Sequence, residues 1–166
     1  MILPAFLLTI VFKLMVTLSP GDKAPDFKAV STDGTVISLA DYKGKSNVIL
    51  YFYPEDMTSG CTVEACNFRD DKSKFDGLNT VILGVSMDDQ EKHKQFTEKD
   101  HLNFPLLVDT DGKICKDYGV PADEDRYPER WTFLIDKNGN IAKVYHKVAV
   151  RVHSEELQND IKAMAH

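Results

Sequence analysis

The chain has 166 residues, of which 43% are apolar and 28% charged, a balance that excludes a disordered chain, a fibre and a multi-pass membrane protein. Twenty basic residues against 26 acidic ones leave a formal charge of −6, so we expect no nucleic-acid partner. The three cysteines are too few for a disulfide scaffold, and their odd number leaves at least one thiol unpaired within a monomer.

Residues Met1–Leu18 are far more apolar than the rest of the chain, and three interpretations of them stay open. The uncharged core, Ala5–Phe12, is shorter than the roughly 20 residues of a membrane span, and Lys13 interrupts it. The core suits a secretory signal or anchor, although a basic start and a clear cleavage site are missing. Alternatively, Met15 is the true start and the preceding residues are a spurious extension, or the segment packs on the body. We expect a cytoplasmic protein, or an exported or membrane-anchored one if Met1–Leu18 is genuine.

Residues 19–166 are expected to form one domain, because no repeat, low-complexity tract or Pro/Gly-rich linker divides them. The domain opens with a predicted β-hairpin, in which Phe27–Val30 and Thr35–Leu39 flank a turn at Asp33 and Gly34. Asn47–Tyr53 is a continuous apolar, β-branched and aromatic run, which is typical of a strand buried on both faces.

Helices and strands then alternate along the chain. The predicted elements are a loop over Pro54–Gly60, a helix from Cys61 to about Phe75, a strand over Thr80–Val85, a helix ending near Lys99, a strand over Phe104–Val108, a short helix over Gly112–Tyr118, a hairpin of Trp131–Ile135 and Ile141–Tyr145, and a helix from Ser154. Ser86 or Asp88 is the expected cap of the helix that ends near Lys99. This order predicts an α/β fold, a mixed sheet with helices on both faces, because crossover helices must cover a parallel core.

The junction between the first buried strand and its helix carries the candidate chemistry. Cys61 stands in the predicted first turn, where unpaired N–H groups and the positive end of the helix dipole stabilise a thiolate. Thr58 is expected to place a hydroxyl beside the sulfur, and Pro54 to fix the start of the loop and remove one N–H. Loops at the carboxyl ends of strands also collect ligands. The alternative is that Cys61 is a small buried apolar residue.

Cys66 lies five residues after Cys61 in the same predicted helix. An ideal helix separates their Cα atoms by about 8–9 Å. A disulfide needs a Cα separation below about 7 Å, so the two cysteines can bond only if the first turn unwinds. This spacing excludes a static structural disulfide and suits a redox cycle coupled to local unfolding. The alternative is that Cys66 packs in the core.

The pattern Pro54-x-x-x-Thr58-x-x-Cys61 resembles the active-site motif of the peroxiredoxins, thiol peroxidases with a thioredoxin-like fold. The runs 52–54 and 60–66 are similar to the subfamily of the bacterioferritin comigratory protein, or peroxiredoxin Q. The runs 21–27 and 130–136 match in order and spacing, and the likeness covers about Leu18 to the C-terminus. The resemblance implies a thioredoxin-like fold and reduction of hydrogen peroxide and organic hydroperoxides.

The resemblance also implies a role for each residue of the motif. Cys61 would be the peroxidatic cysteine, which becomes a sulfenic acid. Thr58, the loop N–H groups and Arg130 would hold the peroxide, and Glu64 would orient Arg130; a solvated arginine and an exposed helix charge are the alternatives. Cys66 would resolve the sulfenic acid as a Cys61–Cys66 disulfide, which thioredoxin or a similar dithiol would reduce. We expect a monomer that needs no metal or prosthetic group.

The remaining candidate residues give weaker indications of function. Cys115 lies in a predicted helix outside the family motif, and we expect a structural role, with disulfide exchange as the alternative. The spacing of the cysteines and of the five histidines matches no zinc motif. The polar loop 123–129 is expected to shape the entrance of the site. Two rival functions stay open, a thiol–disulfide oxidoreductase without the C-x-x-C spacing and a binding domain with inert cysteines.

Overall fold

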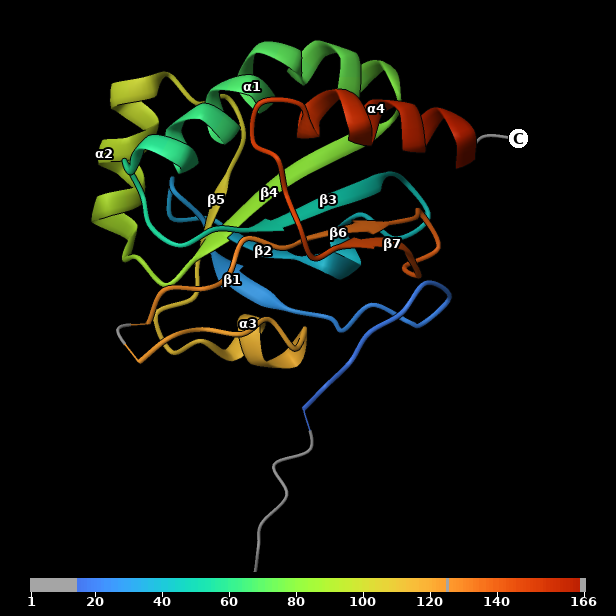
Figure 1. Ribbon diagram of the computed structural model, residues 1–166, viewed down its shortest axis with the longest axis horizontal. Helices are drawn as coiled ribbons and strands as arrows, with labels where there is room; N and C mark the ends of the chain where they lie inside the picture. The colour runs from blue at the N-terminus through green and yellow to red at the C-terminus, as the bar shows by residue number, and fades with distance from the viewer. Residues whose placement is uncertain (1–14, 125, 165–166) are drawn as a thin grey trace, which may run out of the picture.

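A five-stranded mixed sheet forms the centre of the computed structural model, which describes residues 15–124 and 126–164 (Figure 1). The sheet has the order β5-β4-β3-β6-β7, and its strands are β3 (Asn47–Phe52), β4 (Thr80–Ser86), β5 (Leu106–Val108), β6 (Thr132–Ile135) and β7 (Ile141–Tyr145). β3 pairs with β4 in parallel and with β6 in antiparallel fashion. The apolar run of β3 is buried along almost its whole length, as its composition predicts.

Helices and a hairpin cover the two faces of this sheet. The helices are α1 (Ser59–Gly77), α2 (Gln90–Asp100), α3 (Lys113–Asp117) and α4 (His153–Met164), and the hairpin is β1 (Lys28–Val30) with β2 (Val36–Ser38), followed by the short turn η1 (Leu39–Asp41). α1, α2 and α4 lie on one face, and α3 and the hairpin lie on the other (Figure 1). The predicted order of elements and the predicted α/β fold are confirmed.

Each face of the sheet has its own apolar core. Phe68 and Phe75 of α1 pack with Phe96 of α2 and Leu157 of α4 over one face. On the other face the core consists of Phe27, Leu39, Ile114, Cys115 and Tyr118, together with side chains from the sheet. The covering elements therefore bury both sides of the parallel centre, which is the physical requirement of such a sheet.

Several predicted boundaries differ from those of the structure. α1 begins at Ser59, two residues before the predicted start. The cap of α2 is Asp89, whose side chain accepts from the Lys92 N–H at 2.9 Å, and not Ser86 or Asp88. Ser86 is the last residue of β4 and its hydroxyl donates to Asp88, so both side chains are engaged before the helix begins.

β5 is also shorter than predicted, since it begins at Leu106 instead of Phe104. Pro105 has no N–H to contribute to a strand ladder, which accounts for the later start. The interpretations of Met1–Leu18 concern mainly residues 1–14, which lie outside the described residues; within the described part, Leu18 packs against the core. No helix in residues 15–124 and 126–164 combines the length and the apolar character needed to cross a membrane.

Gly84 in the middle of β4 gives a test of this packing. A Cβ at Gly84 would lie 2.8 Å from side-chain atoms of both Tyr51 and Leu106, its partners on the neighbouring strands. We expect Gly84→Ala to lower the free energy of unfolding in urea by about 1–3 kcal/mol, the usual cost of overpacking. Gly77→Ala is the matched control, because a Cβ there meets nothing within 4 Å. Equal stability of the two variants would contradict the tight packing of Gly84.

Candidate active site

The turn between β3 and α1 sets the position of Cys61. Met57 adopts a left-handed conformation with φ of 62°, and Thr58 caps the helix with extended backbone. The Thr62 N–H makes the first helical bond, 2.9 Å from the Thr58 carbonyl. Helix geometry leaves the N–H groups before that bond without an acceptor inside the helix, and Cys61 is the third helical residue. Cys61 therefore lies in the first turn, as predicted.

Arg130, which lies just before Trp131 and β6, contacts the Cys61 sulfur. Its Nη2 donates to Sγ of Cys61 at 3.3 Å, and its Nη1 donates to Oε2 of Glu64 in a short ion pair. Cys61 is 2% exposed and the side chain of Glu64 is 1% exposed. The alternative of an exposed helix carboxylate is therefore wrong for Glu64. The side chain of Arg130 is 20% exposed, but its contacts with Glu64 and Cys61 contradict a freely solvated arginine.

Burial and ion pairing act in opposite directions on this pair. Burial raises the pKa of Glu64 to about 7, although Arg130 works to lower it. Burial alone would lower the pKa of Arg130, but Glu64 and Cys61 beside it raise that pKa overall. The guanidinium is therefore a permanent positive charge directed at the sulfur, suited to stabilising negative charge there. Gly60 leaves room for it, because a Cβ at Gly60 would lie 3.2 Å from Nη2.

Pro54 and Thr58 belong to the loop between β3 and α1. The Thr58 hydroxyl donates to the Glu55 carbonyl at 3.0 Å, and the hydrogen bond to the Cys61 sulfur comes from Arg130 instead. The reason is local, since the reversal at Met57 brings Glu55 and Thr58 together. Pro54 and Thr58 line a hollow of about 610 Å³. Around it lie Pro121 and Ala122 and, from the polar loop 123–129, Asp123, Tyr127, Pro128 and Glu129.

Cys66 lies one turn further along α1 than Cys61, and both are free thiols in the intact helix. The Cys66 thiol is half-buried and donates to Oδ1 of Asp100 at 3.9 Å. Burial raises the pKa of this thiol, and Asp100 adds to the rise, while Arg69 lowers it. The folded helix thus holds the second sulfur apart from the first and in its protonated form.

Cys115 lies on α3, on the opposite face of the sheet, so the structure does not bring it to the site. Its side chain is buried, and burial together with the neighbouring Asp109 raises the pKa of the thiol far above its ordinary value. A thiol that stays protonated is a poor nucleophile. This environment favours the structural role predicted for Cys115.

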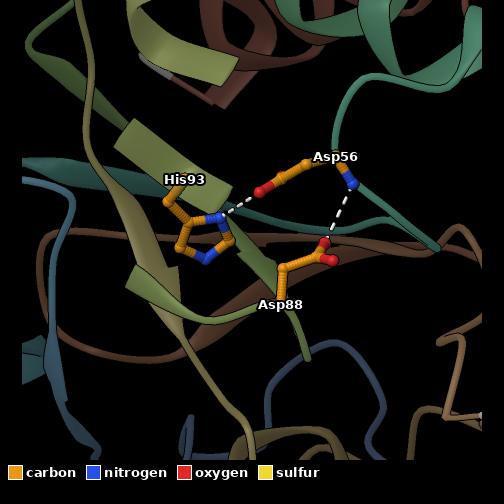
Figure 2. A group of neighbouring side chains, drawn as sticks. All are labelled: Asp56, Asp88 and His93. Carbon is orange, nitrogen blue, oxygen red and sulfur yellow. Dashed lines mark hydrogen bonds and ion pairs between the residues drawn. The ribbon is translucent and has the colours of Figure 1, made fainter. Parts of the chain in front are cut away.

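Asp56, Asp88 and His93 form a polar cluster at the loop before α1, which the sequence did not predict (Figure 2). Asp56 belongs to the loop before α1, Asp88 follows β4, and His93 lies on α2. The spacing of these three residues in the sequence matches no known motif, and only the packing of α2 against the sheet brings them together. A histidine in the middle of a charged helix reads as a surface residue, yet His93 is completely buried.

Comparison with known proteins agrees with this geometry. Residues 20–144 match the model of the AhpC/TSA family. The chain is 45% identical to Peroxiredoxin Bcp of Bacillus subtilis over 155 residues, which are 90% of this chain and 98% of that protein. It is 43% identical to the chloroplastic Peroxiredoxin Q of Oryza sativa subsp. japonica over 130 residues, covering 78% of this chain and 59% of that protein.

Solved structures show the same fold. A cysteine-to-serine mutant of Xylella fastidiosa PrxQ superposes with a TM-score of 0.85 at 31% identity, covering 91% of this chain and 99% of the other. The bacterioferritin comigratory protein of Xanthomonas campestris, solved to study its alkyl peroxide reduction activity, gives a TM-score of 0.82 at 30% identity, with coverages of 89% and 100%. The thioredoxin-like fold implied by the motif is confirmed.

The raised pKa of Glu64 predicts a pH-dependent loss of stability. Between pH 4.5 and about 7 the folded protein keeps a proton on Glu64 that the unfolded chain has already released. The stability that is fully present below pH 4.5 is therefore lost as the pH rises through about 7. We expect this carboxyl to remove about 3 kcal/mol of unfolding free energy over that range. Urea unfolding of wild type and Glu64→Gln between pH 5 and 8 measures it, and the difference should grow with pH. The matched control is Glu98→Gln, the same change at an exposed position of α2. A constant difference would contradict the prediction.

Proposed function

The chain belongs to the AhpC/TSA family, as a peroxiredoxin of the Bcp and PrxQ type, and from this membership we propose how it carries out thiol-dependent reduction of peroxides. The observation that carries the proposal is the 3.3 Å contact between Nη2 of Arg130 and Sγ of Cys61 in the first turn of α1. Cys61 is the peroxidatic cysteine, since this is the one sulfur that faces both a guanidinium and the start of a helix in the described part of the chain.

In the first step the Cys61 thiolate attacks one oxygen of the peroxide. The S–O bond forms, the O–O bond breaks, and the second oxygen leaves as hydroxide or alkoxide and takes up a proton. The sulfur is oxidised to a sulfenic acid and the peroxide is reduced. Arg130 and the first N–H groups of α1 stabilise the charge that moves onto the leaving oxygen. The Thr58 oxygen, which donates its own hydrogen to Glu55, keeps a lone pair to accept the hydrogen of the hydroperoxide.

In the second step Cys66 is the resolving cysteine. Its sulfur attacks the sulfenic sulfur of Cys61, a disulfide forms, and the sulfenic oxygen leaves as water with the thiol proton. Both cysteines belong to α1, and the intact helix keeps their Cα atoms beyond disulfide reach, so the start of α1 unwinds in this step. A dithiol reductant of the thioredoxin type then restores both thiols by exchange.

The hollow next to Thr58 supports organic hydroperoxides as substrates besides hydrogen peroxide. Its walls include the apolar surfaces of Pro54, Pro121, Ala122 and Pro128, which suit the hydrocarbon part of an alkyl hydroperoxide. The similar protein of Xanthomonas campestris is described for its alkyl peroxide reduction activity. A substrate with an apolar tail fits both observations.

Removal of the Cys61 sulfur tests the first step. We expect Cys61→Ser to abolish peroxide-dependent oxidation of NADPH in an assay coupled through thioredoxin and its reductase, because no other thiol faces Arg130. Cys115→Ala is the matched control, since that buried cysteine lies on the opposite face of the sheet. Undiminished turnover by Cys61→Ser would remove Cys61 from the mechanism. Reduction of disulfide substrates without any need for peroxide would favour a thiol–disulfide oxidoreductase.

Removal of the Cys66 sulfur tests the second step. We expect Cys66→Ser to consume one equivalent of peroxide and then stop, because the sulfenic acid on Cys61 has no thiol to resolve it. Mass spectrometry after reaction with dimedone, a reagent for sulfenic acids, should find the adduct on Cys61. Mass spectrometry of the oxidised wild type should instead find Cys61 joined to Cys66. Normal turnover of Cys66→Ser with thioredoxin would contradict the role of Cys66.

A further inference from the structure

A row of three buried, hydrogen-bonded side chains lies at the loop that leads into α1. Its members are Tyr53, Asp56 and His93, which are 1%, 2% and 0% exposed. The Tyr53 hydroxyl donates to Oδ1 of Asp56 at 2.5 Å, and Nδ1 of His93 lies 2.6 Å from Oδ2 of Asp56 (Figure 2). Nε2 of His93 lies 3.0 Å from the Leu107 carbonyl on β5. These hydrogen bonds therefore connect the loop to α2 and to the edge strand of the sheet.

Each ring nitrogen of His93 has its own buried partner. Burial raises the pKa of Tyr53 well above its ordinary value, so this hydroxyl keeps its hydrogen and donates it to Asp56. The other Asp56 oxygen faces Nδ1 of His93, and the Leu107 carbonyl oxygen faces Nε2. Both nitrogens are therefore hydrogen-bonded inside the protein, and His93 joins the loop to β5.

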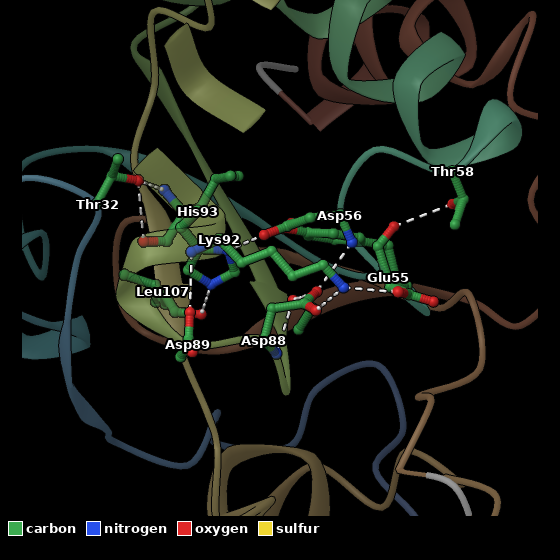
Figure 3. Close-up of polar contacts among 12 residues, drawn as sticks. Thr32, Glu55, Asp56, Thr58, Asp88, Asp89, Lys92, His93 and Leu107 are labelled. Atoms are coloured by element: carbon green, nitrogen blue, oxygen red, sulfur yellow. Dashed lines mark hydrogen bonds and ion pairs between the residues drawn. The ribbon is translucent and has the colours of Figure 1, made fainter. Parts of the chain in front are cut away.

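A second set of contacts fixes the backbone of the same loop. The Asp56 N–H donates to Oδ2 of Asp88 at 2.8 Å (Figure 2), and Lys92 of α2 bridges Asp88 at 2.8 Å and Glu55 at 2.6 Å (Figure 3). Lys92 and His93 are consecutive residues, so one turn of α2 holds the loop through two side chains. Asp56 is thus attached by both its side chain and its N–H group.

Asp56, Asp88 and His93 place one ligand atom each within 4.8 Å of one another, which is the spacing of a cation site. The contacts already described occupy these atoms. Both ring nitrogens of His93 face acceptors, both oxygens of Asp56 accept hydrogen bonds, and Asp88 receives Lys92. The protein's own groups therefore occupy the ligand atoms, and the arrangement is that of a structural clamp on the loop.

The clamp acts on a strained turn. Directly after Asp56 the chain passes through Met57 at a φ of 62°, a left-handed conformation that is unfavourable for a residue with a Cβ. Such a conformation persists where the surrounding contacts determine it. The turn leads straight to Thr58 and to the first N–H groups of α1, which face the peroxide in the proposed mechanism.

We propose that His93 is a positioning residue for the peroxide reaction: its buried hydrogen bond holds Asp56 and, through Asp56, the turn that presents Thr58. The inference rests on the proposed function. His93 touches neither the sulfur nor the substrate, so it contributes to the geometry of the oxygen-binding groups and leaves the contact between Arg130 and Cys61 unchanged.

Two rates measured on the same reduced protein test this role. The first is the second-order rate of Cys61 oxidation by hydrogen peroxide in rapid mixing. The second is the rate of Cys61 alkylation by iodoacetamide, followed by peptide mass spectrometry, which requires the thiolate but no peroxide-binding groups. We expect His93→Gln to slow the peroxide reaction about tenfold through misplacement of those groups, and to change alkylation less than twofold. The matched control is His101→Asn, an exposed histidine at the end of α2 whose φ of 52° suits Asn.

Asp56→Asn keeps the size of the side chain and removes its charge, so it tests the same clamp from the other partner. If His93 acts through Asp56, the double variant Asp56→Asn/His93→Gln should react with peroxide no more slowly than the slower of the two single variants. Additive losses would overturn the proposal. Equal slowing of alkylation and peroxide oxidation would also overturn it, as would a peroxide rate that His93→Gln leaves unchanged. Absence of any peroxide reaction in the wild type would instead refute the proposed function.

Discussion

The Arg130 guanidinium lies between the Cys61 sulfur and the buried Glu64 carboxylate, and the arrangement of the site depends on this contact. The three groups come from two elements that are far apart in the chain, the first turns of α1 and the residue before Trp131 and β6. β6 pairs directly with β3, the strand that leads into the loop, so the sheet itself brings Arg130 to the helix start. Glu64 balances the guanidinium from the side away from solvent, which leaves the other side of the fork for sulfur and substrate.

α1 combines two requirements that oppose each other. Its first turn must be wound to present N–H groups to the Cys61 sulfur, whereas a bond between Cys61 and Cys66 requires that turn to open. The contacts of the second turn favour the wound state, since Cys66 donates to Asp100 and Arg69 donates to the Asp100 carbonyl at the end of α2. Cys66 is also held in its protonated form by burial. The folded helix therefore keeps the two sulfurs apart, and the proposed bond between Cys61 and Cys66 requires a change in the helix.

Polar contacts from α2 fasten the loop before α1. Lys92 forms ion pairs with Asp88 and Glu55, and His93 contacts Asp56, so these contacts hold the chain just before the strained turn at Met57 (Figure 3). α2 thus supports the loop from outside, while α1 and Arg130 surround the Cys61 sulfur. Polar groups that leave water must find partners, and here those partners define one arrangement of the loop.

The order of helices and strands, the two-faced burial of β3 and the place of Cys61 in a first helical turn follow from local patterns, because apolar runs, turn residues and residue spacing act within short segments. The family motif likewise depends on spacing alone. Local patterns failed where several acidic residues compete for one helix start, as at Asp88 and Asp89. They also did not reveal that the Thr58 hydroxyl donates to the Glu55 carbonyl across the reversal at Met57. Burial of Glu64, the contact of Arg130 with the sulfur and the ion pair of His93 with Asp56 required the tertiary structure. Each joins segments between 37 and 69 residues apart, and only the packing of helices on the sheet decides which charged groups leave water together.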